Sequence, residues 1–145
     1  MKKWLLMGVF FLTLALTACN NFNFGNPVGT SSVTISLGDR SLTKNQDTGV
    51  WSLQFTLNAH TLPGSPAGVI NSFTLDGGGT LTAGLRVESC PATSQNDCGP
   101  FSSVAYTEEF FAIPPAGSVV VTAYTIVGEN GAVYTQKLAD PLVIR

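Results

Sequence analysis

Charge and histidine are both scarce in this sequence. Charged residues fill 11% of the 145 positions, against about a quarter in an average soluble protein, and His60 is the one histidine. The formal net charge of −2 leaves no basic surface for a phosphate backbone, so nucleic acid is not an expected partner. A single histidine cannot build a His-rich metal site, and we expect no metal and no cofactor.

Small and hydroxyl-bearing residues, in contrast, are abundant. The chain contains 16 Thr, 12 Ser and 15 Gly, a composition that favours strands and turns over helices. Hydrophobic residues reach 44%, which excludes a disordered chain, and 145 residues fit one domain better than two. We therefore expect a single all-β domain after the N-terminal region.

The N-terminal region has the layout of a secretory signal. Lys2 and Lys3 form a basic start, the 13 residues of 4–16 are apolar, and small residues follow. As a helix this run reaches roughly 20 Å at about 1.5 Å per residue, which is short of the roughly 30 Å hydrocarbon core of a bilayer. The run therefore predicts a removable signal and not a membrane span.

Leu16, Thr17, Ala18 and Cys19 end this region. They resemble the lipobox of bacterial lipoproteins, in which an apolar residue and two small residues precede a cysteine. The resemblance implies that the signal is cut between Ala18 and Cys19 and that the Cys19 thiol carries acyl chains, palmitate among them. An ordinary secretory signal that happens to precede a cysteine is the alternative.

The same resemblance implies a division of the chain and a location. Residues 1–18 are then the signal peptide, residues 19–30 the lipidated cysteine with a flexible tether, and residues 31–145 the β-sandwich domain. Two or three acyl chains hold a protein firmly on a bilayer. We expect anchoring through Cys19 at the cell membrane or outer membrane, on the extracytoplasmic face.

Cysteine parity agrees with this interpretation. If Cys19 carries lipid, Cys90 and Cys98 remain as an even pair in an oxidising compartment, where disulfides persist. Closing so short a loop stabilises a fold by about 2.5 kcal/mol in the chain-entropy picture. A metal site or a redox pair fits poorly, because no histidine lies nearby and the spacing is not C-x-x-C. The sequence predicts a Cys90–Cys98 disulfide.

Apolar and polar residues alternate along three segments, as in half-buried antiparallel strands. The predicted inward-facing sets are Val33, Ile35 and Leu37; Trp51, Leu53, Phe55 and Leu57; and Leu81, Ala83, Leu85 and Val87. Five further segments are strand-like: 69–75, 104–113, 118–127, 132–138 and 142–145. Seven or eight short strands predict an all-β fold, an antiparallel two-sheet sandwich, with a small β-barrel or a jelly roll as the alternative.

Residues 118–131, Ser-Val-Val-Val-Thr-Ala-Tyr-Thr-Ile-Val-Gly-Glu-Asn-Gly, end in a predicted tight hairpin. The segment is similar to the last strands of fibronectin-type and bacterial immunoglobulin-like modules, which implies an immunoglobulin-like sandwich. It departs from antibody-type domains, because Cys90 and Cys98 are local partners and cannot form an inter-sheet disulfide. In the hairpin we expect Asn130 and Gly131 to tolerate positive φ.

Candidates for catalysis are few. His60 falls in a predicted loop, 58–68, without a Gly-x-Ser-x-Gly elbow, and its expected state is a solvated side chain. Glu108 and Glu109 are adjacent, so on a strand they face opposite ways and cannot by themselves form a glycosidase pair. Residues 76–79, Asp-Gly-Gly-Gly, lack the lysine of a phosphate-binding loop and predict a turn. We assign no catalytic residue.

Aromatic residues are the remaining candidates for recognition. Five of them lie on strand-like segments: Tyr106, Phe110, Phe111, Tyr124 and Tyr134. Most are expected in the core, but an outward-facing row of them would stack against a sugar or bind a peptide. Trp51 belongs to the clearest apolar set and is expected in the core.

The sequence therefore predicts a lipid-anchored extracytoplasmic protein whose sandwich binds another envelope component or is structural, without catalysis. The expected partner is the membrane, through the acyl chains on Cys19, and possible further partners are an envelope protein or a polysaccharide. Two alternatives remain. One is a small envelope hydrolase that uses His60 with carboxylates from separate strands, and the other is an inhibitor or adhesion module that presents the Cys90–Cys98 loop.

Overall fold

The structure is a computed structural model and describes residues 32–145. The predicted signal peptide, the tether and Cys19 lie outside the described residues. Within 32–145 the chain forms seven strands and no helix. The strands are β1 (Val33–Lys44), β2 (Trp51–Thr61), β3 (Gly68–Leu75), β4 (Thr80–Val87), β5 (Cys98–Phe110), β6 (Val120–Gly128) and β7 (Val133–Val143). No helix of the described part is long and apolar enough to cross a membrane.

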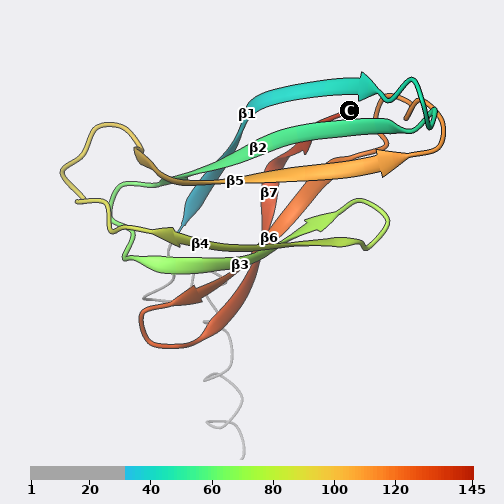
Figure 1. Ribbon diagram of the computed structural model, residues 1–145. Coiled ribbons are helices and arrows are strands. Elements are labelled where there is room, and N and C mark those ends of the chain that lie inside the picture. The colour runs from blue at the N-terminus through green and yellow to red at the C-terminus, as the bar shows by residue number, and fades with distance from the viewer. Residues whose placement is uncertain (1–31) are drawn as a thin grey trace, which may run out of the picture.

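The strands form two stacked sheets, seen as the upper and lower layers in Figure 1. Sheet A has the order β1-β2-β5 and sheet B the order β4-β3-β6-β7, and every neighbouring pair is antiparallel. The prediction of an all-β, antiparallel two-sheet sandwich is confirmed. The two sheets remain separate, so residues 32–145 do not form the closed barrel that was one of the two alternatives.

Alternation along β2 builds one wall of the core. Leu53, Phe55, Leu57 and Ala59 are all at most 2% exposed, as the period-two pattern predicts. Sheet B contributes fully buried side chains to the same core, which include Ile70, Phe73, Val121 and Ile126. At about 25 cal/mol per Å² of apolar surface, this burial is the main stabilising contribution. Trp51, expected in the core, is only half-buried, and the ammonium of Lys44 lies 5.8 Å from its ring centroid.

Tyr124 connects the two sheets at the side of the sandwich where β1 and β7 run. Its hydroxyl accepts a hydrogen bond from the Val33 backbone N–H at 3.1 Å and contacts the side-chain oxygen of Gln136 on β7. Burial raises the pKa of Tyr124, because the phenolate is less well solvated there, and the Val33 hydrogen bond acts in the opposite direction. The buried phenol is therefore satisfied on both sides.

The first strand contains a bulge that changes which side chains face the core. Between the pairs Leu37–Leu57 and Arg40–Phe55, β1 has two residues, Gly38 and Asp39, where β2 has one, so β1 carries one extra residue. Arg40 consequently points to the core side, where its Nη1 donates to the carbonyl of Ile144 at 2.8 Å. Asp39 faces solvent on the other side of sheet A.

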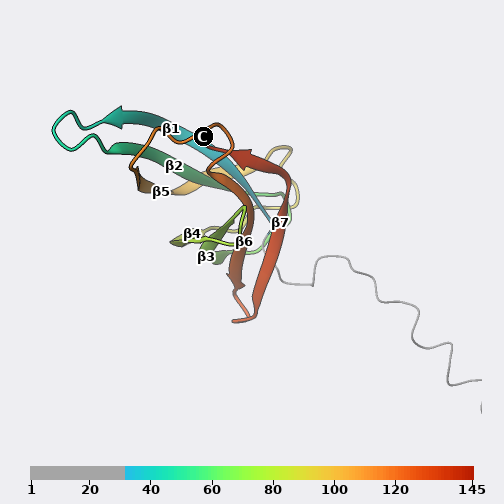
Figure 2. The ribbon, with the colours of Figure 1, turned by 90° about the vertical axis from the view of Figure 1, so that its right-hand side faces the viewer.

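Two strands differ from the predicted segments. The predicted strand 104–113 is β5, which begins at Cys98 and ends at Phe110. The predicted strands 132–138 and 142–145 are one bent strand, β7, in which a bulge interrupts the pairing with β6 between Lys137 and Leu142 (Figure 2). In the β6–β7 turn only Gly131 has positive φ, at 75°, so the expectation for Asn130 was wrong.

Candidate functional site

The side of sheet A that faces away from the core is a nearly continuous polar surface, which we call the polar face. Register and alternation place fifteen side chains on it. These are Thr34, Ser36, Asp39, Ser41, Thr43, Ser52, Gln54, Thr56, Asn58, His60, Phe101, Ser103, Ala105, Thr107 and Glu109. Most carry a hydroxyl or an amide.

These side chains stand in rows across the three strands. Ser41 lies opposite Gln54, and Gln54 lies opposite Thr107. The next row in one direction joins Thr43, Ser52 and Glu109, and a row in the other direction joins Ser36, Asn58 and Ser103. Neighbouring strands lie about 4.8 Å apart, so each row is a set of adjacent hydrogen-bonding groups.

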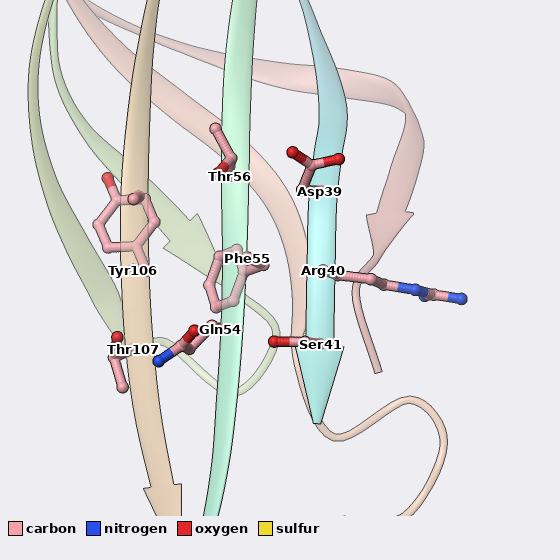
Figure 3. Close-up of a pocket in the computed structure, with 9 residues that line it drawn as sticks. Asp39, Arg40, Ser41, Gln54, Phe55, Thr56, Tyr106 and Thr107 are labelled. Carbon is pink, nitrogen blue, oxygen red and sulfur yellow. The ribbon is translucent and has the colours of Figure 1, made fainter. Parts of the chain in front are cut away.

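The middle of the polar face is hollowed. A cavity of about 380 Å³ lies over the three strands, and its lining residues are Asp39, Arg40, Ser41, Gln54, Phe55, Thr56, Ala105, Tyr106 and Thr107. In Figure 3, Ser41 points from β1 toward β2, while Gln54 and Thr107 lie next to each other. Arg40 extends away from the sheet, which agrees with its bond to Ile144. Ala105 contributes no polar group and, as the smallest side chain in this part of β5, leaves the space open.

A second hollow of about 490 Å³ lies farther along the same strands, at the β1–β2 turn. It is lined by Thr43, Lys44, Asn45, Thr48, Val50, Ser52 and Glu109. The turn beneath it is ordered by Asn45, whose side-chain oxygen accepts from the backbone N–H groups of Asp47 and Thr48. The two hollows lie on adjacent rows of the polar face: the row Ser41–Gln54–Thr107 borders the first, and the row Thr43–Ser52–Glu109 borders the second.

The opposite end of the polar face carries its one outward aromatic ring. Phe101 is 39% exposed and alternates with the inward-facing Ser102. Close by, the Thr34 hydroxyl donates to a carboxylate oxygen of Asp97 at 2.8 Å, and Thr34 lies opposite His60. This end therefore combines a ring, a carboxylate, a hydroxyl and an imidazole.

His60 does not lie in a loop. It belongs to β2, which continues to Thr61 because Ala59 and Thr61 are fully buried and the Thr61 hydroxyl donates to the Glu88 carbonyl at 2.9 Å. Within residues 32–145 the imidazole forms no hydrogen bond with an acid or a hydroxyl. The nearby Asp97 instead accepts from Thr34, whereas a catalytic triad requires the acid to hold the imidazole.

The carboxylates are dispersed. Glu108 lies opposite Leu53 on the core side of β5, and Glu109 lies opposite Ser52 on the polar face, so the two point apart as predicted. Asp76 belongs to the turn between β3 and β4, again as predicted. Among the described residues no group of three His, Cys, Asp or Glu side chains is placed to hold a metal ion.

The predicted Cys90–Cys98 disulfide is present, with an S–S distance of 2.07 Å. Cys90 is buried, and its backbone pairs with the β2–β3 loop through Gly64 and Ser65 at 2.9 Å each. The bridge therefore fixes the β4–β5 connection at the end of the sandwich where β5 begins, next to Asp97 and the Phe101 end of the polar face.

Most of the five aromatic side chains lie in or against the core, as predicted, so they do not form an outward-facing row. Tyr106, Phe110 and Tyr134 are partly buried against the core, and Tyr124 is buried. Of these five side chains, only Phe111 does not pack against the core. It follows the end of β5 and is 96% exposed. Tyr106 packs 5.3 Å from the ring of Phe55, and desolvation raises its pKa to about 12.

A larger groove of about 730 Å³ lies between β1 and β7, at the side of the sandwich. Its lining includes Ile35, Tyr124, Leu138 and Leu142, and Asp140 is the single carboxylate among the residues that line it. Half of its fourteen lining residues are polar or charged, among them Thr135, Gln136 and Lys137, so the groove mixes apolar side chains with hydrogen-bonding groups along two edge strands.

Known proteins add little to this picture. No family model and no curated protein matches the sequence. The solved structures that are similar include a protein assigned as ApaA from Bordetella pertussis and the structural genomics target SoR45. The first is 17% identical over 81% of this chain and 96% of its own, with a TM-score of 0.40. The second is 14% identical over 79% of this chain and 87% of its own, with a TM-score of 0.41.

Proposed function

We propose that this protein is anchored by lipid on Cys19 to the extracytoplasmic face of a bacterial membrane, and that its sandwich domain binds another envelope component without catalysis. The observation that carries the proposal is the Cys90–Cys98 disulfide. It takes both other cysteines, so Cys19 is the odd one, in the lipobox position. A disulfide also fits an oxidising compartment outside the cytoplasm.

The sandwich supports a binding role through its polar face. Fifteen outward side chains and two hollows of about 380 Å³ and 490 Å³ give it a concave surface rich in donors and acceptors. Within 32–145 these groups are not arranged for nucleophilic or acid–base chemistry, because the His60 ring has no acid to orient it and the glutamates diverge. The hydrolase alternative therefore receives no support from this geometry.

The anchoring part of the proposal is tested by labelling and fractionation in a bacterial host. The parent chain is expected to take up radiolabelled palmitate and to sediment with membranes. Cys19→Ser is expected to lose the label and either appear in the soluble fraction or keep its signal peptide. The double variant Cys90→Ser/Cys98→Ser is the control and should keep the label. Equal labelling of the Cys19→Ser variant and the parent would overturn the lipobox interpretation.

A further inference from the structure

The polar face has a composition that selects among possible ligands. We propose that it binds an extended, uncharged glycan chain laid along the strands of sheet A, from the Phe101 end to the Glu109 end. This inference rests on the proposed function, because it names the ligand class of the same binding domain. The site comprises the two hollows and the rows of outward side chains of sheet A.

Hydrogen-bonding chemistry is the first argument. Sugar hydroxyls donate and accept at once, and the Ser, Thr, Asn and Gln side chains of the polar face do the same. The row Ser41–Gln54–Thr107 lines the central hollow, and its hydroxyl and amide groups form no hydrogen bond to one another, which leaves them for a ligand. In the row Ser36–Asn58–Ser103, in contrast, two of the polar groups are already paired, because the Ser103 hydroxyl donates to the side-chain oxygen of Asn58 at 2.6 Å.

Charge is the second argument, and it disfavours polyanions on the polar face. The charged side chains that register places on it are the carboxylates of Asp39 and Glu109, and Asp97 adds a third at the Phe101 end. Two cations border the hollows, but the Arg40 guanidinium donates to the Ile144 carbonyl and the Lys44 ammonium lies over the Trp51 ring. An anionic polymer would meet the outward carboxylates, whereas an uncharged chain with hydroxyl donors meets acceptors.

Side-chain type is the third argument, and it disfavours a protein partner. Protein interfaces are rich in Trp, Tyr, Phe, Met and Arg, and serine is depleted there. Of these five enriched types, the fifteen side chains of the polar face include Phe101 alone. The exposed ring of Phe101, at one end of the polar face, provides an apolar platform against which a sugar ring packs.

A larger side chain at Ala105 would block the central hollow. This residue is exposed, lines the central hollow and lies opposite Thr56. Ala105→Phe fills the hollow with a ring on the solvent side of β5, without entering the core. Thr82→Phe is the matched control, because Thr82 is also exposed and outward-facing on an edge strand, β4, but on sheet B.

The experiment is calorimetric titration of the full chain in a detergent without sugar headgroups. The probes are cellohexaose and the fully N-acetylated chitin hexamer, which are uncharged, and oligogalacturonate, which is anionic. We expect saturable binding of at least one uncharged probe with little dependence on salt. Ala105→Phe should weaken it about tenfold, or roughly 1.4 kcal/mol, and Thr82→Phe should leave it unchanged. Thermal unfolding of each variant establishes that it is folded.

Three results would overturn the inference. The first is no binding of either uncharged probe by folded protein, the second is tighter binding of oligogalacturonate, and the third is equal weakening by Ala105→Phe and Thr82→Phe. If Cys19 is labelled with palmitate in the same preparation, the anchoring proposal stands and the glycan inference alone has failed. A protein ligand that Ala105→Phe displaces would likewise overturn the glycan inference while keeping a binding role for the face.

Discussion

The inner and outer faces of sheet A are made by the same three strands and have opposite chemistry. On β2, Leu53, Phe55 and Leu57 are buried, while Gln54 and Thr56 between them line an open hollow. Because successive side chains point to opposite faces, one strand serves two purposes without conflict. The inner side chains stabilise the sandwich by packing in the core. The outer side chains are not constrained by the core, so their types can suit a ligand.

The two faces of sheet A should therefore respond differently to mutation. Inner-face changes should act on the free energy of unfolding, and outer-face changes should act on binding. Edge contacts such as the Tyr106 hydroxyl, which donates to the Thr82 carbonyl at 2.9 Å across the two sheets, should fall between these extremes.

The largest loss is expected for Phe55→Ala. Phe55 is 2% exposed and packs against Tyr106, so truncation removes a large buried side chain and leaves a cavity. We expect a loss of about 3–5 kcal/mol in the free energy of unfolding. Urea denaturation at neutral pH measures it. A loss under about 1 kcal/mol, the usual cost of a surface change, would mean that the inner face is not the stabilising one.

The double variant Cys90→Ser/Cys98→Ser is expected to come next. The disulfide closes a short loop, with a sequence separation of 8, and Cys90 is buried. We expect a loss of about 2–4 kcal/mol, since the unfolded chain regains its loop freedom. Urea denaturation compared with the parent under oxidising conditions checks this. Binding of an uncharged glycan at Ala105 should persist where the variant is folded, because the bridge lies outside the hollow.

Tyr106→Phe should have an intermediate effect that depends on pH. At neutral pH the lost hydrogen bond to the Thr82 carbonyl costs about 1 kcal/mol. The pKa of Tyr106 rises from 10.0 to about 12 on folding, so its protonated form stabilises the fold below pH 10 and this contribution is lost as pH climbs toward 12. The parent should therefore lose stability over that range more steeply than the variant. Parallel pH dependences in the two proteins would contradict this.

The smallest change in stability is expected for Thr107→Ala. Its side chain is exposed on the polar face and lines the central hollow. We expect the free energy of unfolding to change by about 0.5 kcal/mol or less. Glycan affinity should fall a few-fold, by the net worth of about one hydrogen bond. A stability loss as large as that of Tyr106→Phe would remove the distinction between the two faces of sheet A.

Much of the fold was predictable because alternation is local. The apolar sets on β1, β2 and β4 could be identified from residues two apart, and Val33, Leu53 and Leu85 are buried as expected. The start of β5 was missed because Pro100 interrupts the pattern; a proline is tolerated there since β5 is an edge strand. Pro141 similarly divided β7 into two predicted segments.

The polar face was not predictable, because register is not local. The row Ser41–Gln54–Thr107 joins residues that are far apart in the sequence, and only the strand pairing brings them together. His60 was placed in a loop because the alternation weakens at Ala59 and Thr61, whose burial depends on their partners across the sheets. The polar half of the alternating pattern was the one available signal, and it did not reveal which strands would be neighbours.

Sheet A ends on both sides in strands that resist further pairing. Glu108 places a carboxylate on the core side of β5, and β1 carries the Gly38–Asp39 bulge followed by Arg40. Inward charges and bulges at edges keep strands of other molecules from adding on. Many copies crowded on one surface should therefore remain individual molecules instead of growing into fibrils, and sheet A of each copy should keep its three-stranded width at high local density.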